Sequence, residues 1–117
     1  MKKMALLALV LAVAGCTTET MQVYRSDGAQ QCEGGGISLA QSKAELAGAG
    51  VKVIDSQCAV RTGISIMAMC GAPTLGIHLH EINADDLDKA QQLGFADAKD
   101  LVDTEQGVNF EVSACSE

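Results

Sequence analysis

Two histidines, His78 and His80, alternate along one predicted strand, so both imidazoles lie on the same face. Imidazoles two residues apart can share a metal ion, and Cys58 and Cys70 precede them to complete a Cys₂His₂ donor set for zinc. The two cysteines are farther apart than the close pairs of most zinc sites, and export would favour their oxidation. We therefore expect a polar outer strand face with no metal, and keep metal binding by His78 and His80 as the alternative.

Other residue groups could also bind ligands, but each has a simpler structural explanation. Met67 and Met69 are soft donors that suit Cu(I), although packing or a patch on a sheet face is their expected role. The glycines at 34–36 precede a helix start, where anions can bind, but no phosphate-loop pattern accompanies them. Ser38 is expected to cap that helix. Because the sequence has no recognisable nucleophile constellation, we expect a protein that is not an enzyme and has no catalytic residues.

The first residues have the features of an export signal. Lys2 and Lys3 precede an uninterrupted apolar run over residues 4–14. Such a run rises only about 16 Å as a helix, which is too short for a hydrocarbon core of roughly 30 Å. A basic start, a short apolar run and small residues after it are typical of a secretory signal peptide.

The signal ends in Val13-Ala14-Gly15-Cys16, which resembles the lipobox of bacterial prolipoproteins. The resemblance implies cleavage before Cys16, a diacylglycerol group on its thiol, and an N-acyl chain such as palmitate on the new amino group. It implies no other cofactor. Thr17 rather than an aspartate follows the cysteine, which in such lipoproteins indicates the outer membrane, with the domain facing the periplasm.

The predicted organisation is a signal peptide at 1–15, a lipidated tether at 16–22 and a single small domain at 23–117. The chain has 15 acidic against 8 basic residues, a formal net charge of −7. Such a charge disfavours nucleic acid and spreading on anionic lipid. The expected partners are therefore the membrane, through the lipid anchor alone, and an envelope protein or a small ligand.

Cysteines are expected to stabilise this small domain. Its core has few aromatic residues, which make up only 3% of the chain. An even number of cysteines in an exported chain predicts disulfides, and besides Cys16 there are four: Cys32, Cys58, Cys70 and Cys115. Two bridges would each contribute on the order of 2–4 kcal/mol to the free energy of unfolding.

Apolar periodicity and turn residues predict a sequence of strands and helices. Strands are expected over 21–25, 51–54, 64–69, 77–82 and 108–114, and helices over 38–47 and 84–93. This order is compatible with an α+β, ferredoxin-like β-α-β-β-α-β sandwich that has both helices on one face of an antiparallel sheet. The extra strand at 64–69 leaves the register open.

Three stretches resemble a group of small exported bacterial proteins of uncharacterised function. They are VYRSDGAQQCE at 23–33, MCGAPTLGIHLHEI at 69–82 and KAQQLGF at 89–95. The resemblance implies a shared fold and a link between Cys32 and Cys70, and it brings no activity.

The ferredoxin-like order also accommodates a Cys32–Cys70 disulfide, because its first and third strands are neighbours. Cys58 would then pair with Cys115. The rival connectivity, Cys58–Cys70 with Cys32–Cys115, stays open. Together these features predict a lipid-anchored lipoprotein of the cell envelope whose domain has a structural or binding role.

Overall fold

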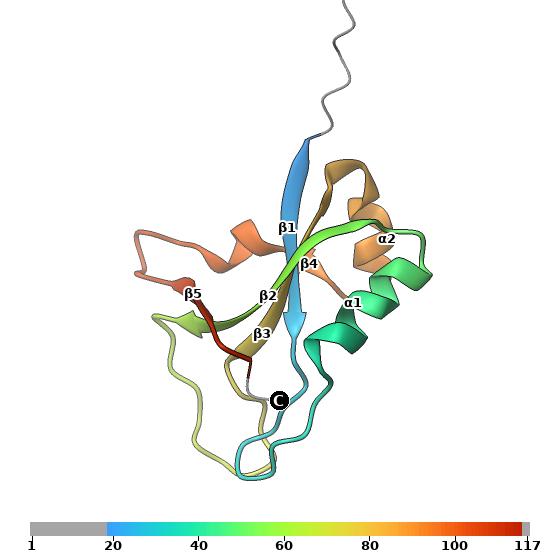
Figure 1. The fold of residues 1–117 in the computed structure, drawn as a ribbon. Helices are drawn as coiled ribbons and strands as arrows, with labels where there is room; N and C mark the ends of the chain where they lie inside the picture. Colours follow the sequence, from blue (N-terminus) through green and yellow to red (C-terminus); the bar gives the residue numbers. More distant parts are fainter. Residues whose placement is uncertain (1–18, 116–117) are drawn as a thin grey trace, which may run out of the picture.

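The computed structural model describes residues 19–115, which form one antiparallel sheet and two helices (Figure 1). The predicted signal peptide and Cys16 lie outside the described residues. The elements are β1 (Thr20–Ser26), α1 (Leu39–Gly48), β2 (Val53–Thr62), β3 (Gly76–Asn83), α2 (Leu87–Gln92), β4 (Ala96–Asp97) and β5 (Asn109–Ser113). Short 3₁₀ turns, η1 (Ala84–Asp86) and η2 (Ala98–Leu101), precede α2 and follow β4. Within this part of the chain, no helix is long and apolar enough to cross a membrane.

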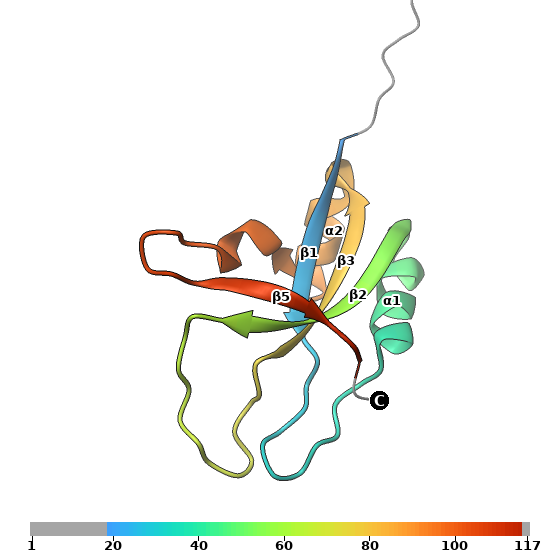
Figure 2. The ribbon, with the colours of Figure 1, turned by 60° about the vertical axis from the view of Figure 1, so that its left-hand side comes forward.

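The sheet confirms the predicted α+β fold. Its strand order is β4-β1-β3-β2-β5, and every neighbouring pair is antiparallel. The first four strands and two helices follow the β-α-β-β-α-β order of a ferredoxin-like sandwich. β5 extends this sheet beyond β2, as Figure 2 shows.

One predicted strand was wrong, and the last predicted strand has another neighbour than in a ferredoxin-like sheet. Residues 64–69 form no strand and belong to the loop between β2 and β3, because both edges of β2 are already paired with β3 and β5. The predicted final strand is present as β5, but the two-residue strand β4 takes the place beside β1. β1 begins at Thr20 and so includes residues 20–22 of the expected tether.

β3 lies at the centre of the sheet, and both of its faces are buried. α1 and α2 cover one face through the helix-side core, which consists of Val23, Leu46, Val51, Ile82, Ala90 and Phe95. η2 covers the other face through a second core of Ala59, Ile77, Leu79, Ala98 and Leu101. The short turn η2 therefore supplies the second layer.

The start of α1 is defined by its first residues. Ser38 adopts an extended conformation at the N-cap, and its Oγ accepts a hydrogen bond from the Gln41 amide at 3.1 Å. The Gln41 side chain accepts one from the Ser38 amide at 3.0 Å. This capping box confirms the predicted role of Ser38 and positions the loop that precedes the helix.

Two disulfides hold irregular segments in place, with the connectivity that the resemblance and the fold favoured. Cys32–Cys70 joins the loop before α1 to the loop before β3, with 5.0 Å between the Cα atoms. Cys58–Cys115 joins β2 to the segment after β5, with 5.2 Å between the Cα atoms. The rival pairing of Cys58 with Cys70 is excluded.

Candidate functional site

The two histidines of β3 are buried, so the expected polar outer strand face was wrong. His78 is 3% exposed and His80 is fully buried, because the central strand is covered on both faces. In the antiparallel register, His80 lies opposite Val23 of β1 and Ser56 of β2. Both imidazoles therefore face the layer that contains α1.

His80 is held by two serines. Its Nε2 lies 2.7 Å from Ser42 Oγ on α1, and its Nδ1 lies 2.8 Å from Ser56 Oγ on β2. A neutral imidazole has one donor and one acceptor nitrogen, and a hydroxyl can serve as either partner. Whichever nitrogen carries the proton, one serine accepts a hydrogen bond from the ring and the other donates one to it.

The surroundings of His80 keep its ring neutral. Burial is the main cause that lowers its pKa to about 4, and the nearby His78, Arg25 and Lys43 lower it further. The Phe95 ring packs edge-on against the imidazole, with 5.6 Å between the ring centroids. His80 is thus a structural residue of the helix-side layer, fully hydrogen-bonded within the protein.

The Cys₂His₂ set, which was the alternative to a strand face without metal, is not assembled. Cys58 and Cys70 belong to different disulfides, so neither is available as a thiolate ligand. Among residues 19–115, no three side chains of His, Cys, Asp or Glu are grouped so that they could hold a metal ion. The ring centroids of His78 and His80 are 6.4 Å apart.

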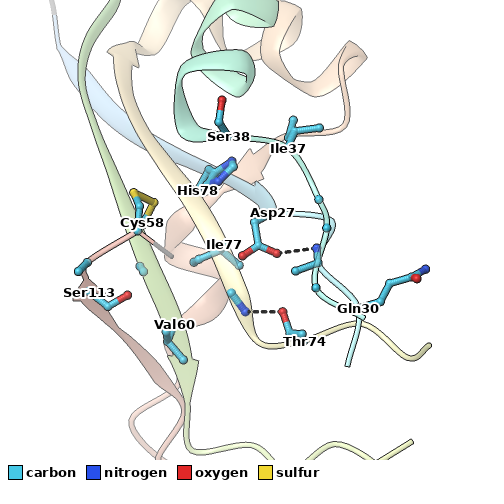
Figure 3. A pocket seen from close by; sticks show the side chains of 18 residues that line it. Asp27, Gln30, Ile37, Ser38, Cys58, Val60, Thr74, Ile77, His78 and Ser113 are labelled. Carbon is cyan, nitrogen blue, oxygen red and sulfur yellow. Dashed lines mark hydrogen bonds between the residues drawn. A yellow bond between two sulfur atoms is a disulfide. The ribbon is translucent and has the colours of Figure 1, made fainter. Parts of the chain in front are cut away.

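A pocket of about 610 Å³ lies beside His78 (Figure 3). One wall comes from the loop before α1 and includes Ile37 and Ser38. The opposite wall comes from the Cys58–Cys115 disulfide and from Ser113 at the end of β5. Many of the lining residues are glycine, alanine or serine, and the small size of their side chains leaves the space between these walls.

Asp27 organises the side of the pocket that contains the loop. Its amide donates a hydrogen bond to the Gly76 carbonyl at 3.1 Å, and its carbonyl accepts one from the Ile37 amide at 3.0 Å. Its carboxylate accepts a hydrogen bond from the Ala29 amide at 2.9 Å and packs against Gly76. Asp27 therefore joins the end of β1 to the start of β3 and to the residue before the helix cap.

Gly36 is required by this arrangement. Its φ is +83°, and a Cβ there would collide with the backbone carbonyl oxygen of Asp27. The glycines at 34–36, which the sequence suggested as an anion site, thus form part of the pocket wall. Of these glycines, Gly36 is needed because the backbone at Asp27 approaches it closely.

Sequence reasoning recognised some of these residues and missed others. His78, Ser38 and the glycines were candidates, but Asp27, Ser42 and Ser56 were not singled out as site residues. Ser42 lies four residues before the buried Leu46, and that helical spacing was the available signal. No comparable pattern marked Ser56.

Comparison with models of protein families, with curated proteins and with solved structures gives no match for this chain.

The close approach at Gly36 predicts a specific loss of stability. We expect Gly36→Ala to lower the free energy of unfolding by at least about 1 kcal/mol more than Gly35→Ala, measured by urea denaturation. Gly35 is the matched control because its φ is +79° but nothing lies within 4 Å of the Cβ that alanine would add. Equal losses in the two variants would contradict the role given to the contact with Asp27.

The lowered pKa of His80 predicts that stability falls as the pH falls from about 6.5 towards 4. In this range the unfolded chain binds a proton at His80 while the folded protein does not. Between pH 7 and pH 5 we expect this group alone to lower the free energy of unfolding by about 2 kcal/mol. Urea denaturation of the natural protein and of His80→Gln at both pH values measures it, and an identical pH dependence in the two would refute the assignment.

Proposed function

We propose that this chain is a lipoprotein anchored in the outer membrane through Cys16, whose periplasmic domain binds a small ligand or an envelope protein without catalysing a reaction. The observation that carries the binding role is the pocket beside His78, which is about 610 Å³ in volume. The lipobox resemblance at 13–16 supports the anchor, and the two disulfides agree with an oxidising compartment.

The position of the pocket suits a domain tethered at its first strand. β1 runs from Thr20 to Ser26, and Asp27 in the pocket wall follows directly. A strand of this length spans about 20 Å. Figures 1 and 2 both show the loops that follow β1 and precede β3 at the end of the sheet opposite the start of β1. A lipid on Cys16 would therefore leave this end of the domain turned away from the membrane.

The chemistry of the lining favours binding over catalysis. Ser38 and Asp27 are engaged in holding the backbone, through the capping box and the turn at the end of β1. Small apolar groups from Ile37, Val60 and Ile77 lie near them. A mostly apolar hollow with a few polar groups is typical of a site for a small amphipathic molecule.

The segment between Ser113 and Cys115 is important to this proposal because it closes one side of the pocket. It has no regular structure after β5, and the disulfide to Cys58 holds it against β2. A preformed wall lowers the entropy lost when a ligand binds.

The anchor is tested by the intact mass of the protein extracted from membranes with detergent, after alkylation of free thiols without reduction. We expect a chain that starts at Cys16, carries acyl groups and has no alkylated cysteine. Cys16→Ala should abolish the acylated species, and Thr17→Ala, the matched control, should retain it. An unacylated mass for the natural protein would refute the anchor.

The pocket is tested by filling it. On β5, Ser113 pairs with Cys58 and its neighbour Val112 pairs with Ala59. The side chains of Ser113 and Val112 therefore point to opposite faces of the sheet. We expect Ser113→Phe to lower the affinity for the apolar dye anilinonaphthalene sulfonate at least about fivefold, as measured by dye fluorescence, and Val112→Phe to leave it unchanged. No dye binding by the natural protein, or equal binding by both variants, would contradict the proposal.

A further inference from the structure

The loop between β2 and β3 presents two methionines to solvent. Met67 is 70% exposed and Met69 is 55% exposed. The expected roles of these residues were packing or a patch on a sheet face. Their exposure does not agree with packing, and a sheet-face patch is excluded because residues 64–69 form no strand. The exposed thioethers of Met67 and Met69 therefore need another explanation.

The backbone that carries these methionines is held by one side chain. The side-chain Nε2 of Gln31 donates a hydrogen bond to the Met67 carbonyl at 2.9 Å, and the side-chain Oε1 accepts one from the Met69 backbone amide at 3.0 Å. A carbonyl and an amide two residues apart are bonded in the same way by a neighbouring parallel strand. The Gln31 side chain thus holds the backbone on both sides of Ala68, and with it the segment that carries Met67 and Met69.

The surrounding bonds make this arrangement rigid. The Gln31 backbone amide donates to the Ala72 carbonyl at 2.8 Å, and its carbonyl accepts from the Gly71 amide at 2.9 Å. The adjacent Cys32–Cys70 disulfide joins the same two loops covalently. The two thioethers therefore project from a backbone whose position is determined by the fold.

We propose that Met67 and Met69 together form a site for a soft monovalent cation, Cu(I). Thioether sulfur is a soft donor and selects Cu(I) over harder ions. The four cysteines of the described residues are all in disulfides, so thioethers are the soft donors that these residues offer. The formal net charge of −7 favours the approach of any cation.

This site is independent of the proposed pocket. Neither methionine lines the pocket, and the loop that carries them lies at the end of the sheet opposite the start of β1 (Figures 1 and 2). It also differs from the metal alternative considered for His78 and His80, because those imidazoles are buried. Failure of the pocket experiment would leave the methionine site untouched.

The test is titration of the full acylated protein, in detergent, with Ag(I) by calorimetry and with Cu(I) supplied as its bicinchoninate complex under ascorbate. Ag(I) is a soft ion that needs no reductant, and ascorbate keeps copper monovalent. We expect one ion to bind per chain, and the double variant Met67→Leu and Met69→Leu to weaken binding at least about tenfold. Leucine preserves volume and apolar character, so the fold and any apolar docking surface are retained.

Met21→Leu is the matched control, because this methionine is packed against the helix-side core, and it should bind as the natural protein does. Copper X-ray absorption should show sulfur neighbours in the natural protein and lose them in the double variant. No binding by the natural protein would overturn the proposal. Equal binding by the double variant would also overturn it, since the ion would then be held elsewhere.

Discussion

The structure depends on β3 being buried on both faces while carrying an imidazole towards the helices. A buried polar group without partners costs about 1–3 kcal/mol, so His80 has to be hydrogen-bonded within the protein. Ser42 and Ser56 meet this requirement from α1 and β2, at 2.7 and 2.8 Å. These bonds help to hold α1 on the sheet, together with the packing of Leu46. Because Ser38 caps the same helix, they also help to position the loop that forms one pocket wall.

Arg25 of β1 contacts the same helix-side layer as His80. Its guanidinium donates to Glu45 of α1 at 2.9 Å and to the Leu93 carbonyl after α2 at 2.9 Å, and it lies 4.2 Å from the centre of the Phe95 ring. The hydrogen bond from Arg25 lowers the pKa of Glu45. A single exposed ion pair contributes little to stability, but this one side chain connects β1 with both helices. Its positive charge is also one reason why His80 stays neutral.

The sequence predicted those elements that depend on neighbouring residues, such as helix caps and alternating strands. The capping box at Ser38, the alternation before Asn83 and the even cysteine count indicated α1, β3 and the disulfides. The alternation at 64–69 was equally clear and misleading, because periodicity does not reveal that both edges of β2 are occupied. β4 has only two residues and no periodicity to detect. The alternation that paired His78 with His80 correctly placed them on one face, but whether that face was buried depended on where α1 packs.

The disulfides connect the stability of this domain with its chemistry. Both bridges attach segments that lack regular structure, and the chain-entropy model assigns a loop of 38 residues about 4 kcal/mol. Without the Cys32–Cys70 bridge, the loops around Gln31 and Met67 would be joined only by non-covalent contacts, among them the hydrogen bonds of the Gln31 backbone and side chain. Oxidation also removes the thiols as ligands, which leaves thioethers as soft donors. The same covalent bonds that make the pocket walls rigid therefore shift any soft-metal chemistry of the described residues towards Met67 and Met69.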